Sequence, residues 1–204
     1  MFIRNDMDVS YVRVFHASPD APPVDIYVNG GLAFKNLSFK EFSEYVQLPM
    51  GEYKIEVFPA GQKVTPVLTQ NVQVPEKQVI TIAVVGNFED LQLVPYIEGN
   101  ADGLPANESR VRIIHLSPDA PGVDMLIDGR LAFEDVKFMD ATDYAQIPSG
   151  IYNVTIDISD TNDAVLTLKV ELKSQKVYTI YIVGNPPNLS VIQSLDGSTF
   201  VRFR

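Results

Sequence analysis

An internal repeat limits the fold of this chain more than any other feature of its sequence. An offset of 99 residues aligns VRVFHASPDAPPVDIYVNGGLAF, which begins at Val12, with VRIIHLSPDAPGVDMLIDGRLAF, which begins at Val111. The match continues through LPMGEY and IPSGIY, and after a shift of one residue VITIAVVGN at 79 matches VYTIYIVGN at 177. Because a segment of about 100 residues can bury its own core, we expect the 204-residue chain to form two copies of one domain.

The stretch between the two copies has the composition of a connector. It reads EGNADGLPANES, is rich in Gly, Asn, Asp and Pro, and lacks apolar periodicity, which is typical of a loop. We therefore predict a first repeat over residues 1–99, a linker over 100–109 and a second repeat over 110–197.

The last seven residues echo the start of each repeat. STFVRFR is similar to VSYVRVFH and ESRVRIIH, which open the two copies, and this similarity predicts an extra strand within residues 198–204. An open sheet edge attracts further strands. We hypothesise that this strand either covers the second domain or pairs with another chain and so forms a homo-oligomer.

Both copies show the sequence pattern of β-strands. Short runs rich in Val, Ile, Tyr, Phe and Thr alternate between two faces and are separated by turn residues. In the first run, Val12, Val14 and His16 share one face. The segment nearest to a helical period is FKNLSFKEFSEY, for which we expect at most a short helix. The pattern predicts an all-β chain of two tandem antiparallel β-sandwich domains, immunoglobulin-like or transthyretin-like.

A second repeated motif, Pro-x-Gly-x-Tyr, leads into a strand in each copy. It occurs as LPMGEY and as IPSGIY. The motif resembles the tyrosine corner of β-sandwiches, in which a tyrosine hydroxyl bonds to the backbone a few residues upstream. We predict that Tyr53 and Tyr152 are the two corner residues.

Composition excludes several classes of function. The chain has no Cys, which excludes disulfides, thiolate metal sites and a cysteine nucleophile. A formal net charge of -10 opposes binding to phosphate backbones, so we expect no nucleic-acid partner. We expect no transmembrane segment, because no apolar stretch approaches the length of a membrane span, and no signal peptide is visible in MFIRNDMDVSY.

The motif with the most residues that could act in catalysis or metal binding is the decapeptide His-x-Ser-Pro-Asp-Ala-Pro-x-Val-Asp, which occurs once in each repeat. Its candidate binding or structural residues are His16, Ser18, Asp20, Asp25, His115, Ser117, Asp119 and Asp124. As catalysts, His16, Ser18 and Asp25 would be a base, a nucleophile and an orienting acid, but no Gly-x-Ser-x-Gly elbow accompanies them. As metal ligands, His16, Asp20 and Asp25 offer an imidazole and two carboxylates, at a spacing that matches no recognised pattern.

A structural role explains every residue of the decapeptide. Ser-Pro-Asp-Ala favours a type I turn, in which Pro19 fixes φ and Asp20 accepts local backbone hydrogen bonds. His16 would be buried at the end of its strand, where either Asp25 or a loop carbonyl could be its partner. We therefore predict that the decapeptide fixes a corner of the fold, with no catalytic residue, no cofactor and no metal.

One further segment, DISDTNDA at residues 157–164, is unusually acidic. It has the carboxylate density of a calcium loop, but it lacks the Gly and the distal Glu of the EF-hand pattern. We interpret it as the tip of a hairpin.

The repeated motifs together resemble a known family. The two decapeptides, each followed by a glycine at 30 or 129, the Pro-x-Gly-x-Tyr turns and the later Val-Gly-Asn are similar to the bacterial family called domain of unknown function 4397. The resemblance covers most of both halves. It implies a β-sandwich domain that often occurs in tandem in secreted or cell-surface proteins, and it brings no established catalytic residues.

These observations leave three functional hypotheses. The first, which we favour because the sequence lacks a credible active site, is a non-enzymatic structural or interaction module of the bacterial cell surface or envelope, with a protein or carbohydrate partner. The second is a carbohydrate- or peptide-binding protein that uses loops at one end of each sandwich together with exposed Tyr27, Phe15 or Tyr11. The third is a metal-dependent or serine hydrolase centred on the decapeptides.

Overall fold

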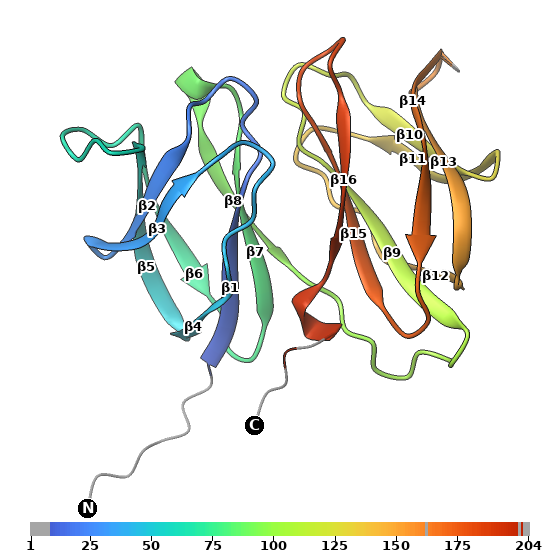
Figure 1. The fold of residues 1–204 in the computed structure, drawn as a ribbon, viewed down its shortest axis with the longest axis horizontal. Coiled ribbons are helices and arrows are strands. Elements are labelled where there is room, and N and C mark those ends of the chain that lie inside the picture. Colours follow the sequence, from blue (N-terminus) through green and yellow to red (C-terminus); the bar gives the residue numbers. More distant parts are fainter. Residues whose placement is uncertain (1–8, 162, 200, 202–204) are drawn as a thin grey trace, which may run out of the picture. The chain divides into compact units, whose positions relative to one another are not determined.

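The computed structural model describes residues 9–161, 163–199 and 201 of the chain. The chain divides after Glu98 into two compact units. In its described part each unit is a β-sandwich of two four-stranded sheets (Figure 1). The prediction of an all-β chain with two tandem sandwich domains is therefore confirmed.

The first unit contains eight strands within its described residues. They are β1 (Val9–His16), β2 (Val24–Val28), β3 (Gly31–Leu37), β4 (Val46–Pro49), β5 (Gly51–Pro59), β6 (Leu68–Val74), β7 (Val79–Val85) and β8 (Gln92–Ile97), with the 3₁₀ helix η1 (Phe88–Asp90) before β8. One sheet has the strand order β4-β1-β7-β8, and the other has the order β3-β2-β5-β6.

The second unit repeats this arrangement strand for strand. Its described strands are β9 (Glu108–His115), β10 (Val123–Ile127), β11 (Arg130–Val136), β12 (Ala145–Pro148), β13 (Gly150–Ile158), β14 (Asp163–Leu172), β15 (Val177–Val183) and β16 (Ser190–Leu195), followed by the 3₁₀ helix η2 (Gly197–Thr199). The sheet orders are β12-β9-β15-β16 and β11-β10-β13-β14. The two copies of the sequence repeat thus have the same strand topology.

One strand pair in each unit is parallel, which the sequence pattern did not predict. Strand β1 runs parallel to β7, and β9 runs parallel to β15. Five strands separate β1 from β7 along the chain, so no tight hairpin requires these two strands to be antiparallel. The β2–β3 hairpin has a two-residue turn: Asn29 and Gly30 have φ values of 49° and 81°, which suit the turn that such a hairpin prefers.

The hydrophobic core of each unit lies between its two sheets. Alternation along β5 shows how it forms, because Ile55 and Val57 are buried, whereas Lys54 before them is exposed and Glu56 between them is half-buried. The two cores use equivalent positions. Val14, Ile26 and Ile82 in the first core correspond to Ile113, Met125 and Ile180 in the second. Each such side chain contributes about 1.5–3 kcal/mol by leaving water.

The central strands β7 and β15 are buried on both faces. All seven residues of each strand are buried, although a two-layer sandwich needs to bury only one face of a sheet. In the first unit, residues 38–45 cover part of the outer face, where the ring of Phe42 stacks on Phe15 at a centroid distance of 4.0 Å. An isolated bridge joins the same two residues. The segment expected to hold at most a short helix, residues 34–45, instead contains the end of β3, a turn at Phe39 and Lys40, and a non-helical stretch that includes Phe42.

The unit boundary lies close to the predicted linker, but the described part of the predicted extra strand is not a strand. The break falls after Glu98, and β9 begins at Glu108, inside the predicted linker, because Ser109 is buried and pairs with Ile147. Gly197–Thr199 forms η2, not a strand, and Val201 is outside any strand. The rest of the predicted strand, residues 200 and 202–204, lies outside the described residues.

Every helix in the described part of the chain is too short to cross a membrane.

Both predicted tyrosine corners are formed. The hydroxyl of Tyr53 donates a hydrogen bond to the carbonyl of Pro49 at 2.9 Å, and the hydroxyl of Tyr152 donates to Pro148 at 2.6 Å. Each bond spans four residues, and so it ties the start of β5 or β13 to the end of the preceding strand.

Removing either corner hydroxyl should cost a modest amount of stability. We expect Tyr53→Phe and Tyr152→Phe each to lower the free energy of unfolding by about 0.5–1.5 kcal/mol, the net value of one hydrogen bond. Urea denaturation of the full chain, followed by circular dichroism, measures this change. Equal stability of both variants and the wild type would show that the corners contribute nothing.

Candidate functional site

The decapeptide forms the corner at which the chain leaves one sheet and enters the other. In the first unit it begins at His16, the last residue of β1, bends at Pro19 and Asp20, and ends at Asp25 within β2. The second copy makes the same connection from β9 to β10. Because β1 and β2 belong to opposite sheets, the decapeptide links the two layers of the sandwich.

Each decapeptide histidine is fully buried and bonds to a loop carbonyl. The Nε2 atom of His16 lies 3.1 Å from the carbonyl oxygen of Pro22, and that of His115 lies 3.0 Å from the oxygen of Pro121. A carbonyl oxygen only accepts hydrogen bonds, so Nε2 must carry the proton in both rings. The backbone N–H of Ser117 donates to Nδ1 of His115 at 3.2 Å, so this ring is the neutral Nε2–H tautomer.

Burial determines the charge of these histidines. Desolvation lowers the pKa of His16 below its usual value, although the Pro22 hydrogen bond and the charge of Glu41 act in the opposite direction. The pKa of His115 is lowered for the same reason, against the effects of Pro121 and Asp140. Both imidazoles are therefore neutral near pH 7 in the folded chain.

These lowered pKa values predict that the protein loses stability in mild acid. Below about pH 6.5 the unfolded chain binds protons at its histidines, whereas the folded chain does not until the pH reaches the lowered values. The free energy of unfolding should therefore fall as the pH drops from about 6.5, by up to about 1.4 kcal/mol per pH unit for each histidine.

Denaturant unfolding between pH 8 and pH 5 tests this pH dependence. The control is a double variant with His16→Gln and His115→Gln, which keeps every carboxylate of the chain and lacks both imidazoles. Its stability should depend less steeply on pH in this range. An equal slope for the two proteins would show that the histidines are not the source.

The serine and the first aspartate of the motif have different contacts in the two units. In the first unit, Oδ1 of Asp20 accepts hydrogen bonds from the Ser18 hydroxyl at 3.4 Å and from the backbone N–H of Phe88 at 2.8 Å. The second bond ties the decapeptide to η1. In the second unit Pro186 occupies the position equivalent to Phe88 and has no N–H to donate. The hydroxyl of Ser117 is buried there without a hydrogen-bond partner among the described residues, and Asp119 belongs to the same loop.

The second aspartate connects its strand to the following strand and to the turn after β5 or β13. The carboxylate of Asp25 is buried and accepts the backbone N–H of Asn36 at 2.7 Å and that of Gly61 at 2.9 Å. Its counterpart Asp124 accepts the N–H of Asp135 at 2.8 Å and the Ser159 hydroxyl at 2.7 Å. Asp25 and His16 thus have different partners, and of the two alternatives predicted for the histidine, the loop carbonyl is the one that is formed.

These contacts do not assemble a catalytic triad. In a triad the imidazole contacts both the nucleophile and the carboxylate, but the Nε2 atom of His16 bonds to Pro22, while Ser18 and Asp25 bond elsewhere. Across the described ranges, no group of three or more His, Asp or Glu side chains is placed to hold a metal ion. Instead, the histidine and the second aspartate of each decapeptide form hydrogen bonds to backbone groups.

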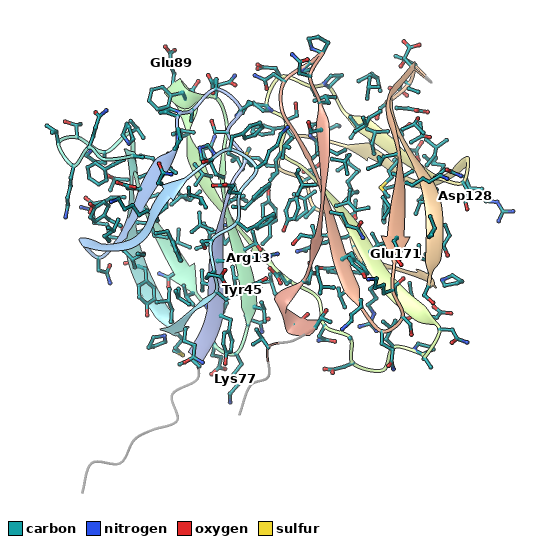
Figure 2. The ribbon with its side chains drawn as sticks, viewed as in Figure 1. Arg13, Tyr45, Lys77, Glu89, Asp128 and Glu171 are labelled. Carbon is teal, nitrogen blue, oxygen red and sulfur yellow. The ribbon has the colours of Figure 1, made fainter. Side chains whose placement is uncertain are left out.

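A buried polar network on the outer face of the first sheet was not predicted. It consists of Arg13, Tyr45, Thr81 and Glu98; Figure 2 labels Arg13 and Tyr45, which lie close together. Nη2 of Arg13 lies 3.0 Å from Oε1 of Glu98, and Nε of Arg13 donates to Thr81 at 2.8 Å. The hydroxyls of Thr81 and Tyr45 donate to the same carboxylate at 2.5 and 2.7 Å. The guanidinium also lies over the rings of Phe42 and Tyr45.

The second unit has the same network with one shorter side chain. Arg112, Tyr144 and Thr179 repeat the first three residues, and Asp196 takes the place of Glu98. Because Asp is one methylene shorter, Nη2 of Arg112 is buried without a hydrogen-bond partner in the described part of this unit. Burial, with the nearby charge of Asp196, raises the pKa of Tyr144 far above its usual value. In the sequence, the signal for this network is an Arg and a Thr that recur inside apolar runs of both repeats.

Two of the three aromatic residues predicted to be exposed are buried. Phe15 is fully buried because it stacks on Phe42, and Tyr27 is buried because it packs edge-on against Phe58 at 5.2 Å with Lys63 over its ring. Tyr11 is half-buried, and its hydroxyl accepts a hydrogen bond from Gln47. The predicted aromatic binding surface is therefore wrong for Phe15 and Tyr27. Phe15 is covered by Phe42 from the segment after β3, and Tyr27 by Phe58 of the neighbouring strand β5 together with Lys63.

Fold and site together define a tandem β-sandwich protein whose corner motif is internally bonded. The family described as Domain of unknown function (DUF4397) matches residues 10–126 and again residues 109–203. The chain belongs to this family and contains two copies of its domain. A comparison with curated proteins gives no match.

Three solved structures are similar to the chain at low TM-scores. The Bacillus anthracis TIE protein is 12% identical, with a TM-score of 0.29, over 87% of this chain and 34% of its own. A leucine-rich repeat protein from Bacteroides thetaiotaomicron is 14% identical, with a TM-score of 0.24, over 89% of this chain and 26% of its own. CBMbc (family CBM26) from Eubacterium rectale Amy13K, in complex with maltoheptaose, is 9% identical, with a TM-score of 0.29, over 93% of this chain and 99% of its own. This chain therefore spans about a third of the first protein and about a quarter of the second.

Proposed function

We propose that this chain is a non-enzymatic structural or interaction module of a bacterial cell envelope. One observation carries the proposal: the histidine and the second aspartate of each decapeptide form hydrogen bonds within the fold. His16 and His115 bond to loop carbonyls, and Asp25 and Asp124 bond to backbone N–H groups of the following strands, β3 and β11. A motif of this kind stabilises a scaffold. Binding of a partner would then depend on residues at the surface of that scaffold.

The same contacts argue against a hydrolase at the decapeptide. A general base needs a free ring nitrogen that faces a substrate proton. The ring of His16 is fully buried, its Nε2 proton is bonded to Pro22, and its Nδ1 is buried as well. A substrate could reach this ring only after the corner had opened.

A turnover assay tests the non-enzymatic part of the proposal. The full chain would be incubated with chromogenic esters, phosphate monoesters, glycosides and peptides, next to a double variant with His16→Ala and His115→Ala. We expect no rate above the buffer blank for either protein. A rate shown by the wild type and lost in a folded double variant would overturn the proposal.

A cosedimentation assay tests the interaction part. Purified chain would be mixed with isolated bacterial envelope fragments and centrifuged, with an unrelated β-sandwich protein of similar charge as the control. We expect the chain to pellet with the envelopes and the control to remain in solution. Recovery of the chain in the supernatant, at the level of the control, would contradict an envelope-binding role.

A further inference from the structure

The two units differ at several positions around an aspartate that occupies the same place in each unit. Asp25 and Asp124 occupy the same place in β2 and β10, and each accepts the backbone N–H of the residue at the bulge in the next strand. Four neighbours of this aspartate differ between the units: Pro23, Asn36, Phe58 and Ala60 in the first are Gly122, Asp135, Asp157 and Ser159 in the second. Three of these four changes add a carboxylate or hydroxyl oxygen to the second unit, and they raise the local count of carboxylates from one to three.

Two of these carboxylates lie side by side on one sheet face. Asp124 in β10 is paired with Asp157 in β13 across the antiparallel ladder, so their side chains project from the same face with Cβ atoms about 5 Å apart. The first unit pairs Asp25 with Phe58 at this place. Two like charges directly opposite each other destabilise a sheet unless something neutralises them.

The carboxylate of Asp157 has an oxygen with no hydrogen-bond partner. The residue is only 9% exposed, and its Oδ1 atom is buried without a donor among the described residues. The hydrogen bonds of Asp124 all go to Oδ1, from the Asp135 N–H and the Ser159 hydroxyl, so its Oδ2 accepts none from the described part of the unit. A buried carboxylate oxygen without a donor is costly in a folded protein unless it binds a cation.

The third carboxylate occupies space that a glycine provides. A Cβ atom at Gly122 would lie 2.5 Å from Oδ1 of Asp135, so the proline that the first unit has at this position would displace the carboxylate. The other oxygen of Asp135 pairs with Nζ of Lys137 at 3.1 Å in an exposed ion pair. The change from proline to glycine thus makes room for Asp135 at the edge of the Asp124–Asp157 pair.

We propose that the second unit binds a calcium ion through the carboxylates of Asp124 and Asp157 and the hydroxyl of Ser159, with Asp135 at the edge of the site. Carboxylate and hydroxyl oxygens are hard ligands, which suit Ca²⁺ and exclude the thiophilic metals. Calcium also tolerates irregular geometry and several water ligands, as a pair of carboxylates on a sheet face requires. The proposal departs from the sequence-based expectation of no metal. It shares Asp124 with the second decapeptide, and its other two ligands, Asp157 and Ser159, belong to the acidic segment 157–164 that the sequence predicted to be a hairpin tip.

The site is absent from the first unit, which supplies an internal control. There the carboxylate of Asp25 is satisfied by two backbone N–H groups, and Phe58 replaces the second carboxylate. Because no three carboxylates within the described ranges converge on a point before an ion is present, the affinity should be that of an extracellular module, with a Kd of about 10⁻⁴–10⁻³ M.

Isothermal titration of the chelator-treated full chain with calcium chloride tests this proposal. We expect one ion to bind per chain, and we expect Asp157→Asn and Asp157→Phe, the latter copying the first unit, to weaken binding at least tenfold. The control is Asp102→Asn, which removes an exposed charge elsewhere and should leave binding unchanged. The absence of binding at 10 mM calcium, or equal binding by the wild type and both Asp157 variants, would overturn the proposal.

A stability measurement separates loss of binding from loss of fold. Without calcium, Asp157→Asn should be at least as stable as the wild type, because the substitution removes one of two opposed like charges. With calcium, the wild type should gain thermal stability and the variant should not. A variant that is less stable than the wild type without calcium would show that Asp157 has a structural role that needs no ion, which contradicts the proposal.

Discussion

Replacing Glu98 by glutamine should lower the free energy of unfolding of the first sandwich by about 3–5 kcal/mol. Glu98 forms a salt bridge with Arg13 at 3.0 Å, and both side chains are almost completely buried. Glutamine fills the same volume but removes the negative charge of this pair. Removing one partner of a buried ion pair costs about this much because the remaining charge cannot recover its hydration.

An exposed ion pair in the same unit is the matched control. Lys54 and Glu56 lie 2.7 Å apart, and the lysine side chain is about half exposed, so Glu56→Gln should cost no more than about 1 kcal/mol. Both variants can be compared by guanidinium unfolding of the full chain. A loss of less than 1 kcal/mol for Glu98→Gln, equal to that of Glu56→Gln, would show that the outer-face network does not hold the sheet together.

Replacing Asp25 by alanine should lower the free energy of unfolding of the first sandwich by about 2–5 kcal/mol. Two backbone N–H groups, of Asn36 and Gly61, would lose a charged acceptor, and a hydrogen bond to a charged group contributes about 1.5–3 kcal/mol. Asp25→Asn should fall between alanine and the wild type, because its carbonyl oxygen can keep one of the two bonds.

Hydrogen exchange shows whether this loss arises at Asn36 in β3 and at Gly61 in the turn after β5. The amides of Asn36 and Gly61 should exchange faster in Asp25→Ala than in the wild type, beyond the change expected from global destabilisation. Glu76→Ala, at an exposed position, should stay within about 0.5 kcal/mol of the wild type. Unchanged protection of both amides would contradict the bracing role of Asp25.

The repeat and the strand pattern predict the architecture because both depend on local sequence. Alternation in runs such as VRVFH specifies which face is buried, and Pro-x-Gly-x-Tyr places each tyrosine four residues from the carbonyl to which it bonds. The bend at Pro19 and Asp20 and the burial of His16 could be predicted for the same reason, since both follow local rules. Local rules could not predict the parallel pairing of β1 with β7, which depends on how five intervening strands pack.

The partners of the polar residues are less predictable because they are distant in sequence. Gly61 lies 36 residues from Asp25, and Thr81 lies 68 residues from Arg13. A single sequence does not show which loop returns to which strand. Phe15 and Tyr27 were expected on the surface for the same reason, since the alternating pattern identifies an outer face but does not reveal that Phe42 or Phe58 covers it.

Nuclear magnetic resonance of the two imidazoles tests most directly whether the decapeptide braces the backbone and performs no reaction. The chain has only two histidines, so a long-range ¹H–¹⁵N spectrum of the full chain resolves both rings. The structure predicts two neutral rings protonated at Nε2, with no titration near pH 6.5 while the protein remains folded. Rings protonated at Nδ1, or rings that titrate near pH 6.5 in the folded protein, would show open and reactive imidazoles and would contradict this account.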